Sequence, residues 1–229
     1  QNSDTNPFLC VVFVLFFLSF FLSFFLSYCV PFSVLLRLMD ALAEKDIHAI
    51  VQLPSPMFIS LMTCVQIVLE RPVEEATYAA SIVNRLVTYR YSCQQSSSPS
   101  TAESASSSVS SSIASLQKKK EGWQHFVTHH NHSPTMFDQI LITIFQQVCF
   151  KHCPRLWSMS RPLLPLILNS ADHFRQYKQQ VLSQAPQGRA QVYQLAFSKL
   201  DEDIQPTLSS KNRDRFTKNL YAAVKMIRE

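Results

Sequence analysis

Apolar residues recur at helical spacing in two long stretches of the chain, residues 35–91 and 137–227. The intervals are three and four residues, which place these side chains on one face of an α-helix. Prolines fall largely between the periodic segments, where they end helices instead of interrupting them. The segments are Leu35, Leu38, Leu42, Ile47 and Ile50; Phe58, Leu61, Met62, Val65, Val68 and Leu69; Ala79, Ile82, Val83, Leu86 and Val87; Phe137, Ile140, Leu141, Ile144, Phe145 and Val148; Phe174, Tyr177, Val181 and Leu182; Val192, Leu195, Ala196, Leu200 and Ile204; and Phe216, Leu220, Ala223, Val224 and Ile227.

With the segment from Trp157 to Leu168, this pattern predicts about eight helices and no strand. Helices joined by short turns form either a bundle or an α-solenoid. A period of roughly 40 residues per helix pair is typical of HEAT-like repeats. We therefore predict an all-α fold, an α-solenoid of HEAT-like antiparallel helix pairs, with repeats over residues 34–92 and 133–229.

Only two of the 229 residues are glycines, Gly122 and Gly188. Phosphate-binding loops, nucleophile elbows and dinucleotide turns all need backbone conformations that glycine alone tolerates. This composition therefore disfavours nucleotide-binding α/β folds.

The N-terminal segment, residues 1–33, is hydrophobic and of low complexity. It repeats Phe-Phe-Leu-Ser three times between Phe16 and Ser27, and residues 6–36 contain no charged side chain. Residues 8–32 are long enough to span a membrane, and a buried core helix is a further interpretation. Because all twelve residues of the repeats can be encoded by pyrimidines alone, we favour a third one, that this segment is not native coding sequence.

Residues 93–132 form a segment rich in Ser, Lys and His. A serine tract buries too little apolar surface to offset its ordering entropy. We therefore expect a disordered loop here, between two sets of helices. The boundary on its far side is Ser133, which we predict to cap the next helix, with Pro134 at its first position.

Positive charge is concentrated in the C-terminal portion. Up to Gln95 there are five basic and seven acidic residues, and after it sixteen basic and nine acidic. No aromatic platform interleaves these charges, so nucleic-acid binding is disfavoured. The six cysteines have no disulfide-framework spacing, and four of them lie in hydrophobic segments, which indicates a reducing compartment.

No arrangement of side chains indicates catalysis or a cofactor. The group His125, His129, His130, His132, Cys149 and Cys153 contains ligand types that zinc uses, but it lacks the tight Cys-x-x-Cys spacing of strong zinc sites. The acidic triplet from Asp201 to Asp203 has no histidine or arginine beside it in sequence. We predict a non-enzymatic protein without a metal or cofactor site.

Two runs are distinctive, Trp157-Ser-Met-Ser-Arg-Pro-Leu-Leu164 and Lys211-Asn-Arg-Asp-Arg-Phe-Thr217. We expect the first to begin a helix near Pro162, and the second to open the last helix with Phe216 turned inward. Its charged residues are either a polar face that covers the end of a helix stack or a basic strip that contacts a partner. The candidate strip consists of Lys211, Arg213, Arg215 and Lys218.

These two runs, with Asn219-Leu220, resemble the C-terminal region of the exportin-7 family, Ran-binding nuclear transport receptors of the importin-β superfamily. The resemblance is strong from about Met136 to Leu220 and weaker but collinear from about Leu35 to Tyr91. It does not extend to the Phe-Phe-Leu-Ser repeats, and the serine tract corresponds to an expanded loop.

The resemblance implies a superhelix of HEAT repeats that carries folded cargo through nuclear pores, with Ran-GTP controlling cargo affinity. It implies Ran-GTP, protein cargo and nuclear pore components as partners of the whole receptor, and shuttling between nucleus and cytoplasm. Ran contacts in the family are concentrated in N-terminal repeats, which no segment here resembles. We expect this chain to supply the last three or four helical pairs. A different hypothesis is a membrane-anchored helical adaptor that uses residues 8–32 as its span.

Overall fold

The computed structural model describes residues 32–71, 74–97, 109–151 and 153–229. Within these ranges every regular element is an α-helix. The helices are, in chain order, α2 (Phe32–Lys45), α3 (Ile47–Val51), α4 (Ser55–Leu69), α5 (Ala76–Ser97), α6 (Val109–His132), α7 (Met136–Cys149), α8 (Leu156–Ser160), α9 (Leu163–Asn169), α10 (Ala171–Ser183), α11 (Ala190–Asp201) and α12 (Ser210–Arg228).

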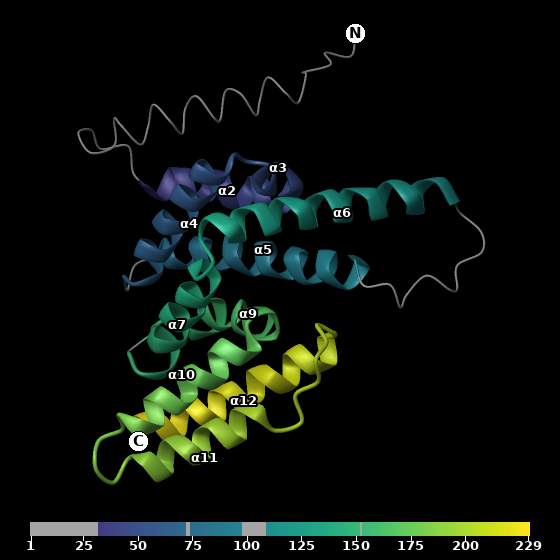
Figure 1. Ribbon diagram of the computed structural model, residues 1–229. Helices are drawn as coiled ribbons and strands as arrows, with labels where there is room; N and C mark the ends of the chain where they lie inside the picture. Colours follow the sequence, from purple (N-terminus) through teal and green to yellow (C-terminus); the bar gives the residue numbers. More distant parts are fainter. Residues whose placement is uncertain (1–31, 72–73, 98–108, 152) are drawn as a thin grey trace.

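The helices are stacked in pairs from α2 and α3 at one end to α11 and α12 at the other (Figure 1). Helix α5 packs against α2, α4 and α6, and α7 connects this part to α9, α10 and α12. Helices α5 and α6 run antiparallel along most of their lengths, as do α11 and α12. The predicted all-α solenoid of helix pairs is confirmed.

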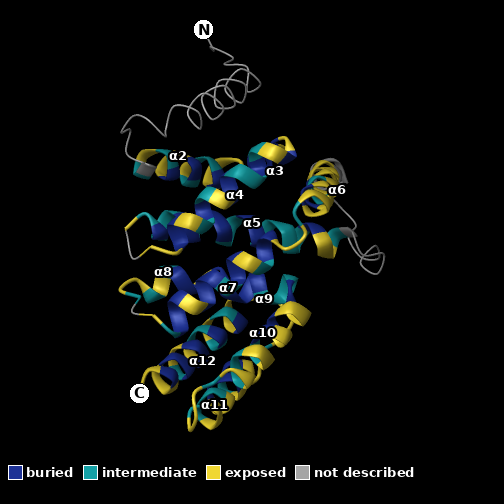
Figure 2. Ribbon diagram, turned by 60° about the vertical axis from the view of Figure 1, so that its left-hand side comes forward, coloured by how far each residue is buried: buried dark blue, intermediate teal, exposed yellow. Residues whose placement is uncertain are grey.

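One continuous hydrophobic core runs through the stack, from Leu36 in α2 to Ile227 in α12. Buried residues face the inside of the stack and exposed residues its outer surfaces (Figure 2). Phe145 lies deep in the core on α7, with its ring centroid 5.1 Å from that of Phe174 and 6.1 Å from that of Phe197. These three rings pack α7, α10 and α11 against one another, so the C-terminal helix pairs share one core.

The prediction of a disordered loop over residues 93–132 needs correction. Helix α5 continues to Ser97, and α6 covers Val109–His132; residues 98–108 lie outside the described ranges. The cause is tertiary packing: Phe126 is buried, and Gly122 lies so close to α5 that an added Cβ would be 2.7 Å from the hydroxyl of Tyr89. A few large side chains at helical spacing order the helix despite its polar composition.

The structure differs from the sequence-based prediction at the start of α7 and at one leucine of α2, and agrees with it at the start of α9. Ser133 and Pro134 lie in the turn before α7, which begins at Met136 after Thr135, so the predicted cap is wrong. Leu38, predicted on the inward stripe of the first helix, is 55% exposed, because Leu36 and Met39 face the core instead. The helix expected near Pro162 begins at Leu163. Its internal Pro165 costs no hydrogen bond, because amides of a first helical turn lack a partner within the helix.

The candidate membrane span over residues 8–32 lies, except for its last residue, outside the described ranges, as does nearly all of the hydrophobic segment 1–33. Among the helices that the structure does describe, none is both long and apolar enough to cross a bilayer.

Candidate interaction surface

The loop between α11 and α12 is held by side chains from the first turns of α12. Ser209 caps the helix, since its Oγ accepts the backbone N–H of Asn212 at 3.3 Å. The Asn212 amide then binds the loop backbone three times. Its Oδ1 accepts the N–H of Gln205 at 2.9 Å, and its Nδ2 donates to the carbonyls of Gln205 and Thr207 at 2.6 and 2.7 Å. This buried amide therefore fixes the path of the loop.

Two arginines of the same run also bind protein groups. The Nε of Arg213 donates to the carbonyl of Leu208 at 3.1 Å, and its Nη2 lies 3.4 Å from the hydroxyl of Thr88 in α5. The Nη1 of Arg215 donates to the carbonyl of Asp203 at 2.8 Å, where the backbone turns through a φ of 57°. Both guanidinium groups thus hold the loop in place, and Arg213 also joins it to α5.

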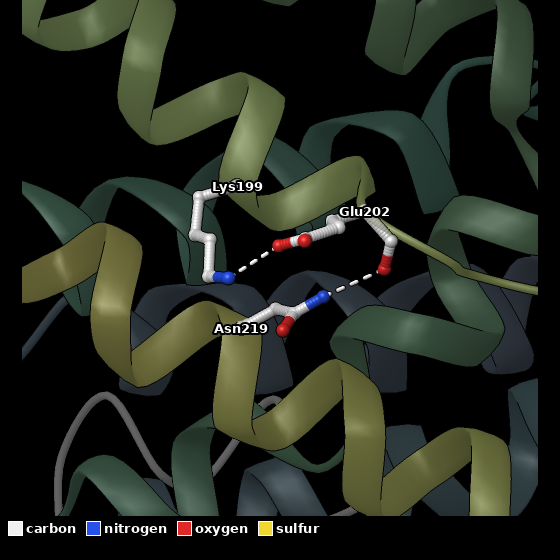
Figure 3. A network of polar contacts seen from close by, with 3 residues as sticks. All are labelled: Lys199, Glu202 and Asn219. Atoms are coloured by element: carbon white, nitrogen blue, oxygen red, sulfur yellow. Dashed lines mark hydrogen bonds and ion pairs between the residues drawn. The ribbon is translucent and has the colours of Figure 1, made fainter.

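Asn219, two turns further along α12, completes this network. Its Nδ2 donates to the carbonyl of Glu202 at 2.7 Å, and the Glu202 carboxylate pairs with Lys199 at the end of α11 (Figure 3). The hydrogen bond and charge of Lys199 lower the pKa of Glu202, and Lys218 contributes in the same direction. The end of α11 is therefore held both through its backbone and through its side chains.

The four residues of the predicted basic strip do not form one surface. Lys211, Arg215 and Lys218 recur at intervals of four and three residues, which places them on one face of α12. Arg213 lies on another face and is partly buried; burial lowers its pKa, and the nearby Arg161 lowers it further. Lys211 and Lys218 are exposed, and neither forms an ion pair with a described residue. The cations open to a partner are therefore Lys211 and Lys218, with Arg215 between them.

Trp157 is the largest exposed aromatic side chain of the described surface. It lies on α8 with 57% of its area exposed, while Met159 and Ser160 of the same short helix are buried. The Ser160 hydroxyl donates to the carbonyl of Trp157 at 3.0 Å and so stabilises this short helix. An aromatic side chain of this size at the surface is typical of protein contact sites, and the sequence patterns gave no indication that it is exposed.

Sequence reasoning also missed the roles of Asn212 and Asn219. A signal was present, because both asparagines are in phase with Phe216 and Leu220 on the buried stripe of α12. A polar residue at a buried helical position needs hydrogen-bond partners. Here those partners are the backbone groups of the preceding loop.

Of the histidines considered for zinc, His129 has a structural role in the core. His129 is buried, stacks on Phe58 with centroids 4.1 Å apart, and its Nδ1 and Nε2 lie 3.0 Å from the Ser55 hydroxyl and 2.8 Å from the Val51 carbonyl. Burial lowers its pKa. Among the described residues, no three His, Cys, Asp or Glu side chains are arranged to hold a metal ion.

Known proteins match part of this chain. Exportin-7-B of Xenopus laevis is 39% identical over 105 residues, which are 46% of this chain and 9% of the frog protein. Ran-binding protein 17 of Homo sapiens is 35% identical over 88 residues, 38% of this chain and 8% of that protein. Ran-binding protein 16 of Drosophila melanogaster is 33% identical over 85 residues, which are 37% of this chain and 8% of that protein. This chain is related in sequence to exportin-7.

The resemblance inferred from the two distinctive runs is thereby confirmed. The chain spans less than a tenth of the length of these exportin-7 and Ran-binding relatives. No protein-family model matches it, and no solved structure matches it. What the similarity supports is a segment of an exportin-7-like receptor built from stacked helices.

Proposed function

We propose that this chain provides C-terminal helical repeats of a nuclear export receptor that acts in Ran-GTP-dependent transport of proteins between nucleus and cytoplasm. Its role is non-enzymatic: it closes the helical stack and offers a surface to a protein partner. The observation that carries the proposal is the agreement of two findings, the stacked helix pairs and the sequence similarity to exportin-7 and Ran-binding proteins.

The surface that we assign to the partner is the exposed part of the basic strip, Lys211 and Lys218 with Arg215. Its base is fixed, because Asn212 and Arg213 hold the preceding loop against the stack. A row of cations on one helix face favours an acidic patch on a protein and raises the rate of encounter, with an effect that weakens as salt increases. We propose that this patch belongs to cargo, while Ran-GTP and nuclear pore components bind other repeats of the whole receptor.

A chimera tests both parts of this proposal. In the frog Exportin-7-B, the matching 105-residue segment is replaced by residues 109–229 of this chain, which contain α6 to α12, and cargo binding is measured with and without Ran-GTP. We expect the chimera to bind cargo in a Ran-GTP-dependent manner, and a receptor lacking the segment to bind weakly. Equal binding by the deleted receptor would contradict the scaffold role.

The strip is tested in the same chimera by reversing two charges, Lys211→Glu with Lys218→Glu. We expect the rate of association with cargo to fall by about tenfold at low salt. The difference between this variant and the unmodified chimera should become smaller as salt rises. The matched control reverses Lys118 and Lys120, two exposed lysines on α6. If both double variants behave alike, the strip does not contact cargo.

A further inference from the structure

A hollow of about 410 Å³ opens at the other end of α12, where the C-terminal ends of α7 and α12 meet α11. Its wall consists of Cys149, Phe150, Lys151, Tyr193, Ile227 and Arg228. Binding pockets for small ligands span roughly 300–1,000 Å³, so this one has room for two adjoining side chains of a peptide. It is separate from the basic strip, which begins some four turns earlier on α12.

The walls of this hollow are held in place by arginine–carbonyl hydrogen bonds. The Nη2 of Arg228 donates to the carbonyls of Val148 and Lys151 at 2.7 and 2.5 Å, and so covers the open carbonyls at the end of α7. Arg189, from the start of α11, donates to the carbonyl of Ile227 in the last turn of α12. Because three helices are joined at this point, little ordering entropy remains to be lost when a ligand binds.

The aromatic side of the hollow is also well defined. The rings of Phe150 and Tyr193 meet edge to face, with centroids 5.6 Å apart. The guanidinium of Arg189 lies over the Tyr193 ring at 5.6 Å from its centroid. Together with Ile227, these rings give an apolar wall against which a ligand side chain can pack.

The charges of the hollow are all positive. Lys151 and Arg228 line it, and none of its six lining residues is acidic. Lys151 makes no ion pair with a described residue, and the hydrogen bonds of Arg228 to described residues use Nη2 alone. The Nε and Nη1 of Arg228 and the ammonium of Lys151 thus remain as donors for an anion.

We propose that this hollow binds a short acidic segment of a protein partner, an Asp or Glu followed by a large apolar residue. The carboxylate is held between Lys151 and Arg228, and the apolar side chain packs on Phe150, Tyr193 and Ile227. An inorganic anion would use the cations but leave the rings unused, which is why the peptide is the better match. The site is distinct from the cargo surface proposed above and does not depend on it.

The test is a titration of the full, ¹⁵N-labelled chain with acetyl-Asp-Phe-amide, followed by NMR. We expect the backbone signals of Phe150, Lys151 and Tyr193 to shift, with a dissociation constant on the order of 1 mM. Two matched probes separate the contributions: acetyl-Asn-Phe-amide removes the charge, and acetyl-Asp-Gly-amide removes the ring. Each is expected to bind at least about threefold more weakly.

The protein side is tested with Lys151→Gln, which removes a cation whose side chain forms no ion pair with a described residue. We expect this substitution to raise the dissociation constant of acetyl-Asp-Phe-amide by about threefold to tenfold. The control is Lys120→Gln, an exposed lysine on α6, which should leave binding unchanged. The proposal is wrong if the Asn-Phe probe binds as well as the Asp-Phe probe, if Lys151→Gln has no effect, or if the three signals do not move.

Discussion

Replacing Asn212 by alanine removes the side chain that fixes the α11–α12 loop. The asparagine is 3% exposed and makes three hydrogen bonds to the backbone of Gln205 and Thr207. Truncation deletes all three bonds and leaves one N–H and two carbonyl groups to find other partners. We therefore expect Asn212→Ala to destabilise the fold even though no apolar contact is lost.

The size of the loss follows from the positions of these backbone groups. A hydrogen bond contributes a net of about 1 kcal/mol, and a buried polar group left without a partner costs about 1–3 kcal/mol. Gln205 and Thr207 are exposed residues, so water can reach the freed groups and the larger penalty does not apply in full. We expect Asn212→Ala to lower the free energy of unfolding by about 2–3 kcal/mol.

The assay is urea unfolding of the full chain followed by far-ultraviolet circular dichroism. Lys211→Ala, at the exposed neighbouring position, is the control and should change the free energy of unfolding by less than about 0.5 kcal/mol. Asn212→Asp should be worse than alanine, because it places a carboxylate against the carbonyl oxygens of Gln205 and Thr207. If Asn212→Ala is as stable as the Lys211 control, the amide does not organise the loop.

Three further predictions concern the core, a turn and a buried histidine. Phe145→Ala should lower the free energy of unfolding by about 3–5 kcal/mol, measured in urea, because its ring is fully buried. Gly188→Ala should cost about 1 kcal/mol in the same assay and Gly188→Asn less, since this turn has a φ of 85°. Burial lowers the pKa of His129 below the ordinary 6.5, and its ring neighbour His125 and the nearby His132 act in the same direction. A histidine with a lowered pKa stabilises the fold at a pH above the pKa that it has in the unfolded chain. This contribution to the free energy of unfolding is lost as the pH falls through its pKa in the folded protein. The urea midpoint should therefore drop between pH 7.5 and pH 5, and His129→Gln should reduce that drop; an equal drop in both proteins would contradict this role.

The helical class and most of the core could be predicted because the apolar side chains that recur at helical spacing are also the ones that the fold buries. The stripe of α7, including Phe145, is buried as its spacing indicates. Leu38 shows the limit of this reasoning, since two adjacent leucines allow more than one inward face and packing partners decide between them. The loop-binding asparagines could not be assigned, because their partners are backbone groups that sequence does not distinguish.

Helix α6 was the largest difference between expectation and structure. Its composition is typical of a disordered segment, yet Gly122 and Phe126 fit against Tyr89 of α5, and His129 packs on Phe58 of α4. Contact between elements outweighs local propensity here, as it does for most helices in proteins. The basic strip shows the same limit: spacing separates Arg213 from the other three residues, but only the structure places its guanidinium on Thr88 and Leu208.

Nuclear export by the chimeric receptor tests the central claim most directly. The rate at which Exportin-7-B moves a fluorescent cargo out of nuclei is compared with the rates of the chimera carrying residues 109–229 of this chain and of the receptor lacking its matching segment. Our account predicts that the chimera exports at a rate within about twofold of the parent and that the deleted receptor fails. A chimera as inactive as the deletion would contradict the claim that this chain is a functional part of such a receptor.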